Sequence, residues 1–198
     1  MRLNLGCADR RIEGFTGVDI APGPEVDEIV DLEAPWPWSD SKVLEVRAHD
    51  VAEHIGDCPH TSIAWHCPSC VEFRQALVRN LGKFSPCGDP CPSHRHALGR
   101  IHFMNELHRV LVPGGTALIE VPSAAHGVGY ITDPTHKTPW CLSLFKYFEA
   151  GTFAHQRLAA SYGITAAFRV LNLQEIEVSG EDSRERVWKI MATLEAVK

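Results

Sequence analysis

Short apolar runs separated by polar turns occupy the first fifty residues of the chain. Four of these runs have the length and composition of β-strands, and they cover residues 1–5, 15–20, 26–30 and 42–50. The segments between them contain glycine, proline, serine and acidic residues, which end strands and form turns. The first quarter of the chain is therefore predicted to consist of short strands joined by turns.

After residue 100 the pattern changes to that of a helix. Apolar residues recur at the helical spacing from Ile101 to Leu111, and the Pro-Gly-Gly of residues 113–115 predicts the end of this helix. His102 and His108 belong to the same segment, and we expect both on its exposed side.

The last part of the chain returns to strands. A buried strand is predicted over 116–122, a helix over roughly 142–162, and strands over 166–178 and 187–197. The polar stretch SGEDSRER between the last two strands favours an antiparallel pair. Strands that alternate with helices predict a mostly parallel, Rossmann-like α/β sheet with that pair at one edge. The length of 198 residues fits a single domain, 1–198.

Residues 56–99 differ in composition and are predicted to be an inserted subdomain between the strand over 42–50 and the following helix. CPSC and CGDPC supply two close cysteine pairs, which resemble the double knuckle of a zinc ribbon. A segment with so few large apolar residues cannot build its own core, so a structural zinc on Cys67, Cys70, Cys87 and Cys91 is predicted. Two alternatives stay open: Cys58 or a nearby histidine as one of the ligands, and iron in place of zinc.

The charge balance limits the classes of partner. The formal net charge of −6 disfavours sequence-independent binding to nucleic acid, although it does not exclude a local basic patch. The sequence has neither an apolar run long enough to span a membrane nor a secretion signal at its N-terminus. We therefore expect a cytoplasmic protein without a membrane partner; its oligomeric state is left open.

The stretch LNLGCADRRIEGFTGVDI, residues 3–20, carries the first candidate chemistry. Gly6 follows the first predicted strand, and Asp19 ends the second, where a carboxylate can accept hydrogen bonds from both hydroxyls of a ribose. Dinucleotide-binding enzymes usually have three glycines and an acid about 20 residues further on. Here one glycine precedes the acid by 13 residues, so a cofactor with a ribose but no phosphates fits better.

Five segments resemble the class I S-adenosylmethionine-dependent methyltransferases, above all a small bacterial and phage group related to the methyltransferase type 11 domain. They are LNLGCADRRIEGFTGVDI, DLEAPWPW, HDVAEHI, FMNELHRVLVPGG and DPTHKTPW, and the resemblance covers 1–55 and 100–198. Two positions depart from the family pattern. Ala8 stands where a second glycine is common, and Asn4 where an acid is common.

The resemblance implies an S-adenosylmethionine site built from residues that follow the first four predicted strands. They are Leu5, Gly6, Cys7, Asp19, Ile20, Asp31, Leu32, His49 and Asp50. The backbone around Gly6 would lie along the methionine part of the cofactor, and Asp19 would hold the ribose. Ile20, Asp31 and Leu32 would contact the adenine, and His49 and Asp50 would lie near the methionine amino group and the reacting methyl.

Methyl transfer to a hydroxyl needs a general base, and histidine suits that task near neutral pH. His136 in DPTH is the first candidate and His54 in AEHI the second, while Asp133 could orient His136 or bind a substrate hydroxyl. DPTH is equally a good turn sequence. We expect a methyltransferase acting on a hydroxyl or amine of a small molecule such as a sugar. The alternatives are a nucleic-acid or protein methyltransferase that recognises its substrate through the zinc insertion, and a non-catalytic binding module.

Overall fold

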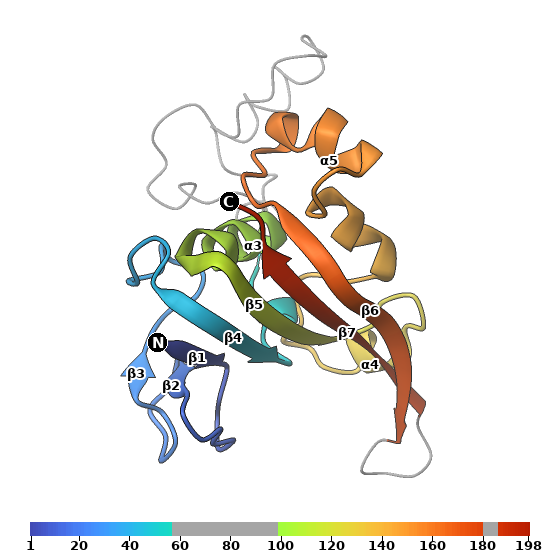
Figure 1. Ribbon diagram of the computed structural model, residues 1–198. Helices are drawn as coiled ribbons and strands as arrows, with labels where there is room; N and C mark the ends of the chain where they lie inside the picture. Colours follow the sequence, from blue (N-terminus) through green and yellow to red (C-terminus); the bar gives the residue numbers. More distant parts are fainter. Residues whose placement is uncertain (57–98, 180–185) are drawn as a thin grey trace, which may run out of the picture.

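The computed structural model describes residues 1–56, 99–179 and 186–198 (Figure 1). The predicted inserted subdomain over 56–99 therefore lies outside the described residues, apart from its two ends. All four candidate zinc ligands, Cys67, Cys70, Cys87 and Cys91, belong to this part of the chain. The structural zinc stays a prediction.

One mixed sheet of seven strands forms the centre of the described protein, in the order β3-β2-β1-β4-β5-β7-β6. The strands are β1 (Arg2–Leu5), β2 (Thr16–Asp19), β3 (Glu28–Ile29), β4 (Val43–His49), β5 (Leu111–Pro122), β6 (Phe168–Ser179) and β7 (Arg186–Ala196). β1 to β5 pair in parallel, and β7 runs antiparallel to both β5 and β6. The prediction of a mostly parallel α/β sheet that ends in an antiparallel hairpin is confirmed.

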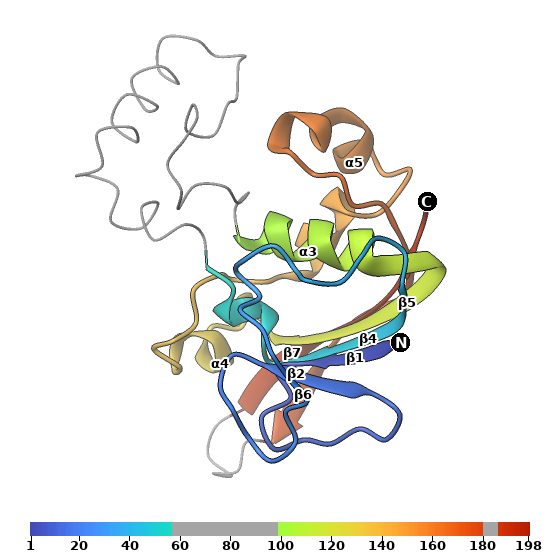
Figure 2. The ribbon, with the colours of Figure 1, turned by 90° about the vertical axis from the view of Figure 1, so that its left-hand side faces the viewer.

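The two faces of the sheet differ because side chains alternate along each strand. Val46, Ala117 and Ile190 point to the fully buried face. Helix α3 (Gly99–Val110) covers this face and contributes Phe103 and Leu107, both fully buried, to the same core (Figure 2). Burial of each large apolar side chain there contributes about 1.5–3 kcal/mol to folding. The opposite face carries half-buried charged side chains of β4, β5 and β7.

The single helix predicted over 142–162 is wrong, because this region holds three short helical segments. They are η3 (Leu142–Tyr147), α5 (Phe153–Leu158) and η4 (Ala160–Tyr162). Gly151 has a φ of 87°, which lies outside the helical region. The helix therefore cannot continue through this residue, which separates η3 from α5. Thr152 then caps α5 by accepting a hydrogen bond from the N–H of His155 at 3.2 Å.

Three details around α3 differ from the prediction. The helix ends at Val110, and β5 starts immediately, so the Pro-Gly-Gly of residues 113–115 lies within the strand, where its pairing with β4 is irregular. Neither histidine of α3 is fully exposed. His102 is 8% exposed, with its Nε2 3.0 Å from the carbonyl oxygen of Ala34, and Nε2 of the half-buried His108 lies 2.8 Å from that of Val197.

Two further short helices, η1 (Ala52–His54) and α4 (Val128–Ile131), follow β4 and β5 respectively. Both lie at the carboxyl end of the parallel strands, which is where ligands of open α/β sheets bind. Within the described ranges, no helix is both long and apolar enough to cross a membrane.

Candidate functional site

The order of the strands reverses between β1 and β4, and the loops that follow these two strands meet there. Gly6, directly after β1, has a φ of 64°, and a Cβ at this position would lie 2.6 Å from Cβ of Val51, which follows β4. The absence of a side chain at Gly6 therefore allows the loops after β1 and β4 to come together.

Asp19 lies at the carboxyl end of β2 and binds the loop after β1. Its Oδ2 accepts a hydrogen bond from the N–H of Ala8 at 2.9 Å, and its Oδ1 accepts one from that of Ala21 at 3.2 Å. A carboxylate offers about four lone-pair positions, so both oxygens keep the capacity to accept from the two hydroxyls of a ribose. The neighbouring Ile20 is 69% exposed, which leaves a large apolar surface beside this acid.

The other residues predicted to bind the cofactor on this side of the sheet differ in which of their groups are exposed. Asp31 is exposed and accepts a hydrogen bond from the N–H of Glu33 at 2.9 Å. The side chain of Leu32 is 5% exposed and belongs to the core, so of this pair only Asp31 faces solvent. The side chains of Leu5 and Cys7 are buried as well, and these two residues offer their backbone only.

Charged groups at the ends of β4, β5 and β7 form a compact network that connects three strands. Nζ of Lys189 lies 2.7 Å from both Asp50 Oδ2 and Glu120 Oε1, and Nδ1 of His49 lies 3.2 Å from Glu120 Oε2. Hydrogen bonds from His49 and Lys189 lower the pKa of Glu120 to about 2. His49 and Asp50 were predicted from the sequence, whereas Lys189 and Glu120 were missed.

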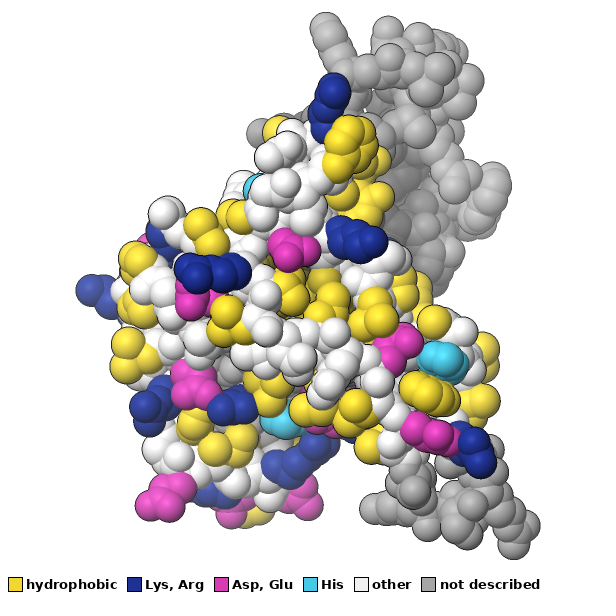
Figure 3. Space-filling view, turned by 45° about the vertical axis from the view of Figure 1, so that its right-hand side comes forward, with side chains coloured by type: hydrophobic (Ala, Val, Ile, Leu, Met, Phe, Trp, Pro, Cys, Tyr) yellow, Lys and Arg dark blue, Asp and Glu magenta, His cyan; other side chains and the backbone are white. Residues whose placement is uncertain are grey.

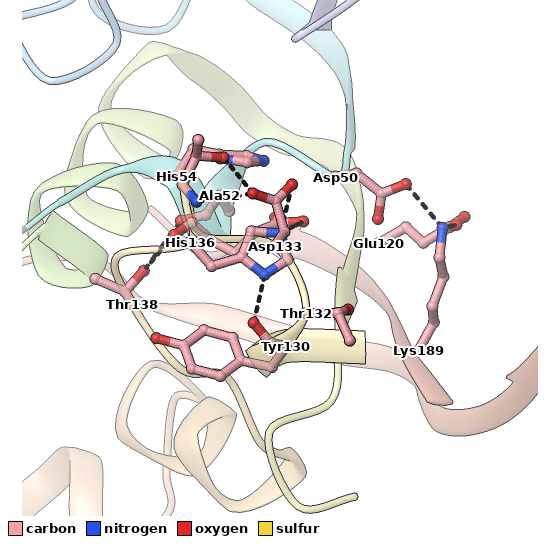
Figure 4. A network of polar contacts seen from close by, with 12 residues as sticks. Asp50, Ala52, His54, Glu120, Tyr130, Thr132, Asp133, His136, Thr138 and Lys189 are labelled. Atoms are coloured by element: carbon pink, nitrogen blue, oxygen red, sulfur yellow. Dashed lines mark hydrogen bonds and ion pairs between the residues drawn. The ribbon is translucent and has the colours of Figure 1, made fainter. Parts of the chain in front are cut away.

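The predicted catalytic residues His54, His136 and Asp133 lie together beyond this network (Figure 4). The rings of His54 and His136 are 4.8 Å apart between centroids and meet edge to face. Nε2 of His136 lies 3.8 Å from Asp133 Oδ2 and equally far from Oε1 of Glu53. We call the group formed by Glu53, His54, Asp133, Thr135 and His136 the histidine cluster.

A buried threonine holds the two chain segments of the histidine cluster together. Thr138 is fully buried, and its hydroxyl lies 3.2 Å from the carbonyl oxygen of Ala52 and 3.4 Å from that of Glu53. The backbone N–H groups of Lys137 and Thr138 also donate to the Glu53 carbonyl, at 2.9 and 3.0 Å. The η1 turn and the loop after α4 are thereby fixed relative to each other.

The hydrogen bonds of the two histidines determine which nitrogen carries the proton. Nδ1 of His136 lies 2.8 Å from the carbonyl oxygen of Tyr130, and a carbonyl can only accept. The hydroxyl of Thr135 donates to Asp133 Oδ1 at 2.6 Å, so Nδ1 of His54, 3.1 Å away, must donate to that hydroxyl. In both neutral rings Nε2 therefore keeps the lone pair.

The surroundings of the two acids of the cluster, Asp133 and Glu53, shift their pKa values in opposite directions. The exposed Asp133 accepts hydrogen bonds from the hydroxyl and the N–H of Thr135, which lower its pKa. Both carboxyl oxygens of Glu53 are buried, and neither has a hydrogen-bond partner in the described part of the chain. Burial raises the pKa of Glu53 to about 8.

Glu53 was missed at the sequence level. The only local signal was an acid directly before a candidate histidine in AEHI. With His54 and His136 it forms a set in which each residue offers one metal-ligating atom, all within 4.8 Å of one another. The turn interpretation of DPTH also holds, because Asp133 accepts from the N–H of Thr135 and His136 donates to the Asp133 carbonyl.

The comparisons with known proteins rest on the fold. No family profile and no curated protein matches the sequence. Among solved structures, the YcgJ protein from Bacillus subtilis is 11% identical with a TM-score of 0.53, over 100% of this chain and 92% of that one.

Two further solved structures contain S-adenosylhomocysteine. They are the 1,6-didemethyltoxoflavin-N1-methyltransferase of Burkholderia thailandensis and the N-methyltransferase NodS of Bradyrhizobium japonicum. Both are 10% identical with a TM-score of 0.50; all of this chain aligns, with 71% of the first and 78% of the second. At such low identity these likenesses show the fold alone, which is a Rossmann-like α/β sheet.

Proposed function

We propose that the protein is an S-adenosylmethionine-dependent methyltransferase that modifies a hydroxyl or amine of a small molecule such as a sugar. The observation that carries this proposal is the position of two groups at the carboxyl edge of one sheet. Asp19, after β2, is suited to a ribose, and the histidine cluster, after β4 and β5, is suited to an acceptor. Ligands of open α/β sheets bind at this edge, where the strand order reverses.

The residues at the end of β2 fit a nucleoside. The carboxylate of Asp19 keeps lone pairs for two hydroxyls, and Ile20 is exposed beside it as a surface for the adenine ring. Asp31, also exposed, is available to the adenine from the end of β3. The backbone after Gly6, together with His49 and Asp50, is proposed to hold the methionine part. S-Adenosylmethionine, when bound, supplies a methyl group that its positive sulfur has already activated.

His136 is the residue best placed to accept the proton that an acceptor hydroxyl loses. Its Nδ1–H is held by the carbonyl of Tyr130, so the lone pair on Nε2 is available for that proton. Asp133, 3.8 Å from this nitrogen, stabilises the positive charge that results. The ring of His54, next to it, is the second candidate, and its Nδ1–H is held by Thr135.

The distribution of charge favours a small acceptor over nucleic acid. On the face drawn in Figure 3, the described Lys and Arg side chains are interspersed with Asp and Glu and form no extended basic patch. The net charge of the whole chain is −6. A sequence-independent contact with phosphates needs a concentrated positive surface instead.

The inserted segment is proposed to be a separate structural unit that a zinc ion stabilises through Cys67, Cys70, Cys87 and Cys91. The observation in support is that the two ends of the segment meet. A Cβ on Gly99 would lie 2.1 Å from the carbonyl oxygen of Gly56, so the chain leaves the sheet domain and re-enters it at one place. Four thiolates suit a closed structural zinc site.

An acceptor screen with methyl-labelled S-adenosylmethionine tests the proposed activity. The panel contains sugars, hydroxy acids and small amines beside RNA and an unrelated protein mixture. Label transferred to a small hydroxyl or amine compound supports the proposal. Label transferred to RNA or protein only would replace it with the macromolecular alternative.

A further inference from the structure

The histidine cluster contains a buried acid that the proposed proton transfer does not use. The side chain of Glu53 is 1% exposed, and both of its oxygens lack a hydrogen-bond donor among the described residues. A buried carboxylate is costly unless a positive group or several donors compensate for it. Nε2 of His136 lies 3.8 Å from Oε1 of Glu53, which is beyond hydrogen-bond distance.

We propose that Glu53, His54 and His136 bind a divalent transition-metal ion. Each residue offers one ligand atom, and the three atoms lie within 4.8 Å of one another. Ligands at about 2.0–2.2 Å from a tetrahedral zinc are roughly 3.5 Å apart, so binding of the ion draws the side chains about 1 Å closer. The ion supplies the positive charge that the buried carboxylate otherwise lacks.

The surrounding hydrogen bonds are those that a metal site needs around its ligands. Metal-binding histidines usually donate the N–H of their second nitrogen to a carbonyl or another polar group, which fixes the orientation of the ring. Nδ1 of His136 does so to the Tyr130 carbonyl, and Nδ1 of His54 does so to the Thr135 hydroxyl. Nε2 of both rings is left for the ion.

The ligand set indicates the class of ion. Two imidazoles with one carboxylate suit Zn²⁺, Fe²⁺, Co²⁺ or Ni²⁺, whereas Mg²⁺ and Ca²⁺ prefer sites made of oxygen atoms alone. Three protein ligands also leave a coordination position for water or an oxygen of the acceptor. If the proposed methyl transfer is correct, the ion replaces His136 as the group that activates the acceptor, because a ligated Nε2 cannot accept a proton. The ion polarises the acceptor hydroxyl, whose proton then passes to water. This role in the reaction rests on the proposed function, whereas binding of the ion does not.

The test is a Co²⁺ titration of the full-length, chelator-treated protein with reduced thiols, without cofactor. Absorption separates the two kinds of site, because cobalt bound to thiolates gives strong near-ultraviolet charge-transfer bands and cobalt bound to nitrogen and oxygen does not. The variants are Glu53→Gln and His136→Ala. The matched control is His126→Ala, since His126 also lies next to a carboxylate, with its Nε2 3.3 Å from Glu175, but is outside the cluster.

Besides the ion that the four cysteines of the inserted segment are proposed to bind, we expect the wild type and His126→Ala to bind one Co²⁺ that adds no thiolate bands. This ion should bind at least about a hundredfold more weakly in Glu53→Gln and His136→Ala. Thr135→Val, which removes the hydroxyl that supports His54 and donates to Asp133, should weaken it by roughly tenfold. Melting of each variant in chelator shows whether it is folded. Glu53→Gln should melt no lower than the wild type, because the amide has nearly the same volume as the carboxyl and no charge.

The inference is overturned if the wild type binds Co²⁺ through thiolates only, or if folded Glu53→Gln and His136→Ala bind as tightly as the wild type. A parallel titration with S-adenosylhomocysteine tests the proposed function independently of the metal site. Cofactor binding without a nitrogen and oxygen cobalt site refutes the metal inference alone. The reverse combination supports the metal site and counts against the methyltransferase.

Discussion

Asp19 and Glu53 are both acids at the carboxyl edge of the sheet, but their surroundings are opposite. Asp19 is half-exposed and accepts hydrogen bonds from two backbone N–H groups of nearby loops. Glu53 is fully buried and lacks a donor in the described part of the protein. The first acid is ready to bind a neutral polar ligand without rearrangement. The second is kept in its neutral form by burial, and its ionised form is stable there only with something positive bound next to it.

This difference assigns the two regions to different tasks in our account. The region of Asp19 is proposed to hold the cofactor, and the histidine cluster is proposed to act on the acceptor. Variants in one region should therefore change one measured quantity and leave the other nearly unchanged. The predictions below test that separation, from the largest expected effect to the smallest.

Replacement of His136 should have the largest effect. His136→Ala removes the proposed proton acceptor, and loss of a general base typically lowers kcat by about 10²–10⁴-fold. Affinity for S-adenosylhomocysteine should stay within about twofold of the wild type, because the half-buried His136 is not among the proposed cofactor contacts. Steady-state kinetics and calorimetry of the same preparation check both parts. Equal losses of turnover and cofactor affinity would contradict the separation.

The second-largest effect is expected at the contact between the loops that follow β1 and β4. Gly6→Ala should destabilise the protein by about 3 kcal/mol, since the new Cβ would lie 2.6 Å from Val51 Cβ and the φ of 64° also disfavours alanine. In a Val51→Gly background the same change should cost only about 1 kcal/mol, because the positive φ alone remains. Urea unfolding of the four proteins measures this. An equal cost in both backgrounds would mean that the contact with Val51 is unimportant.

The charged network between the two regions should give a pH-dependent stability. The pKa of Glu120 is lowered from 4.5 to about 2 in the folded protein, so its ionised form stabilises the fold above pH 4.5. This contribution, about 2 kcal/mol after allowance for partial exposure, is lost as the pH falls from 4.5 towards 2. Urea unfolding across this range should therefore show a shallower decline for Glu120→Gln than for the wild type. Parallel curves would mean that Lys189 and His49 do not stabilise Glu120.

The smallest effect is expected at Thr138. Thr138→Val keeps the shape of the side chain but removes the buried hydroxyl that contacts the carbonyls of the η1 turn. Loss of this hydroxyl should reduce stability by about 1 kcal/mol and turnover by a few-fold, without a change in cofactor affinity. Unfolding and kinetic measurements check it. A loss of cofactor affinity as large as the loss of turnover would show that the two regions are coupled.

The first four strands of the sheet were predictable because each lies in a short apolar run bounded by turn residues. The helix over 142–162 was not, since its apolar spacing continues across Gly151, where the backbone leaves the helical region. His102 and His108 were expected at the surface from their polarity. Their burial depends on carbonyls of Ala34 and Val197, which are remote in sequence.

In the site too, residues whose surroundings depend on contacts remote in sequence could not be predicted. His54, His136 and Asp133 could be found because motifs carry them and because the carboxyl ends of parallel strands converge. Glu53 could not, because it is buried by a loop about 80 residues further along the chain, where Lys137 and Thr138 donate to its carbonyl. Lys189 reaches the site from the last strand, and no local pattern marks it.

The central claim is that the edge of the sheet at Asp19 binds S-adenosylmethionine. Calorimetric titration with S-adenosylhomocysteine of the wild type, Asp19→Ala and Asp27→Ala tests it most directly. Asp27 is a matched control because its Oδ2 also accepts a backbone hydrogen bond, from Gly17 at 2.7 Å, without a proposed cofactor contact. We predict binding by the wild type and Asp27→Ala, and an affinity about a hundredfold lower in Asp19→Ala. Equal affinity in all three proteins, or no binding by the folded wild type, would contradict the account.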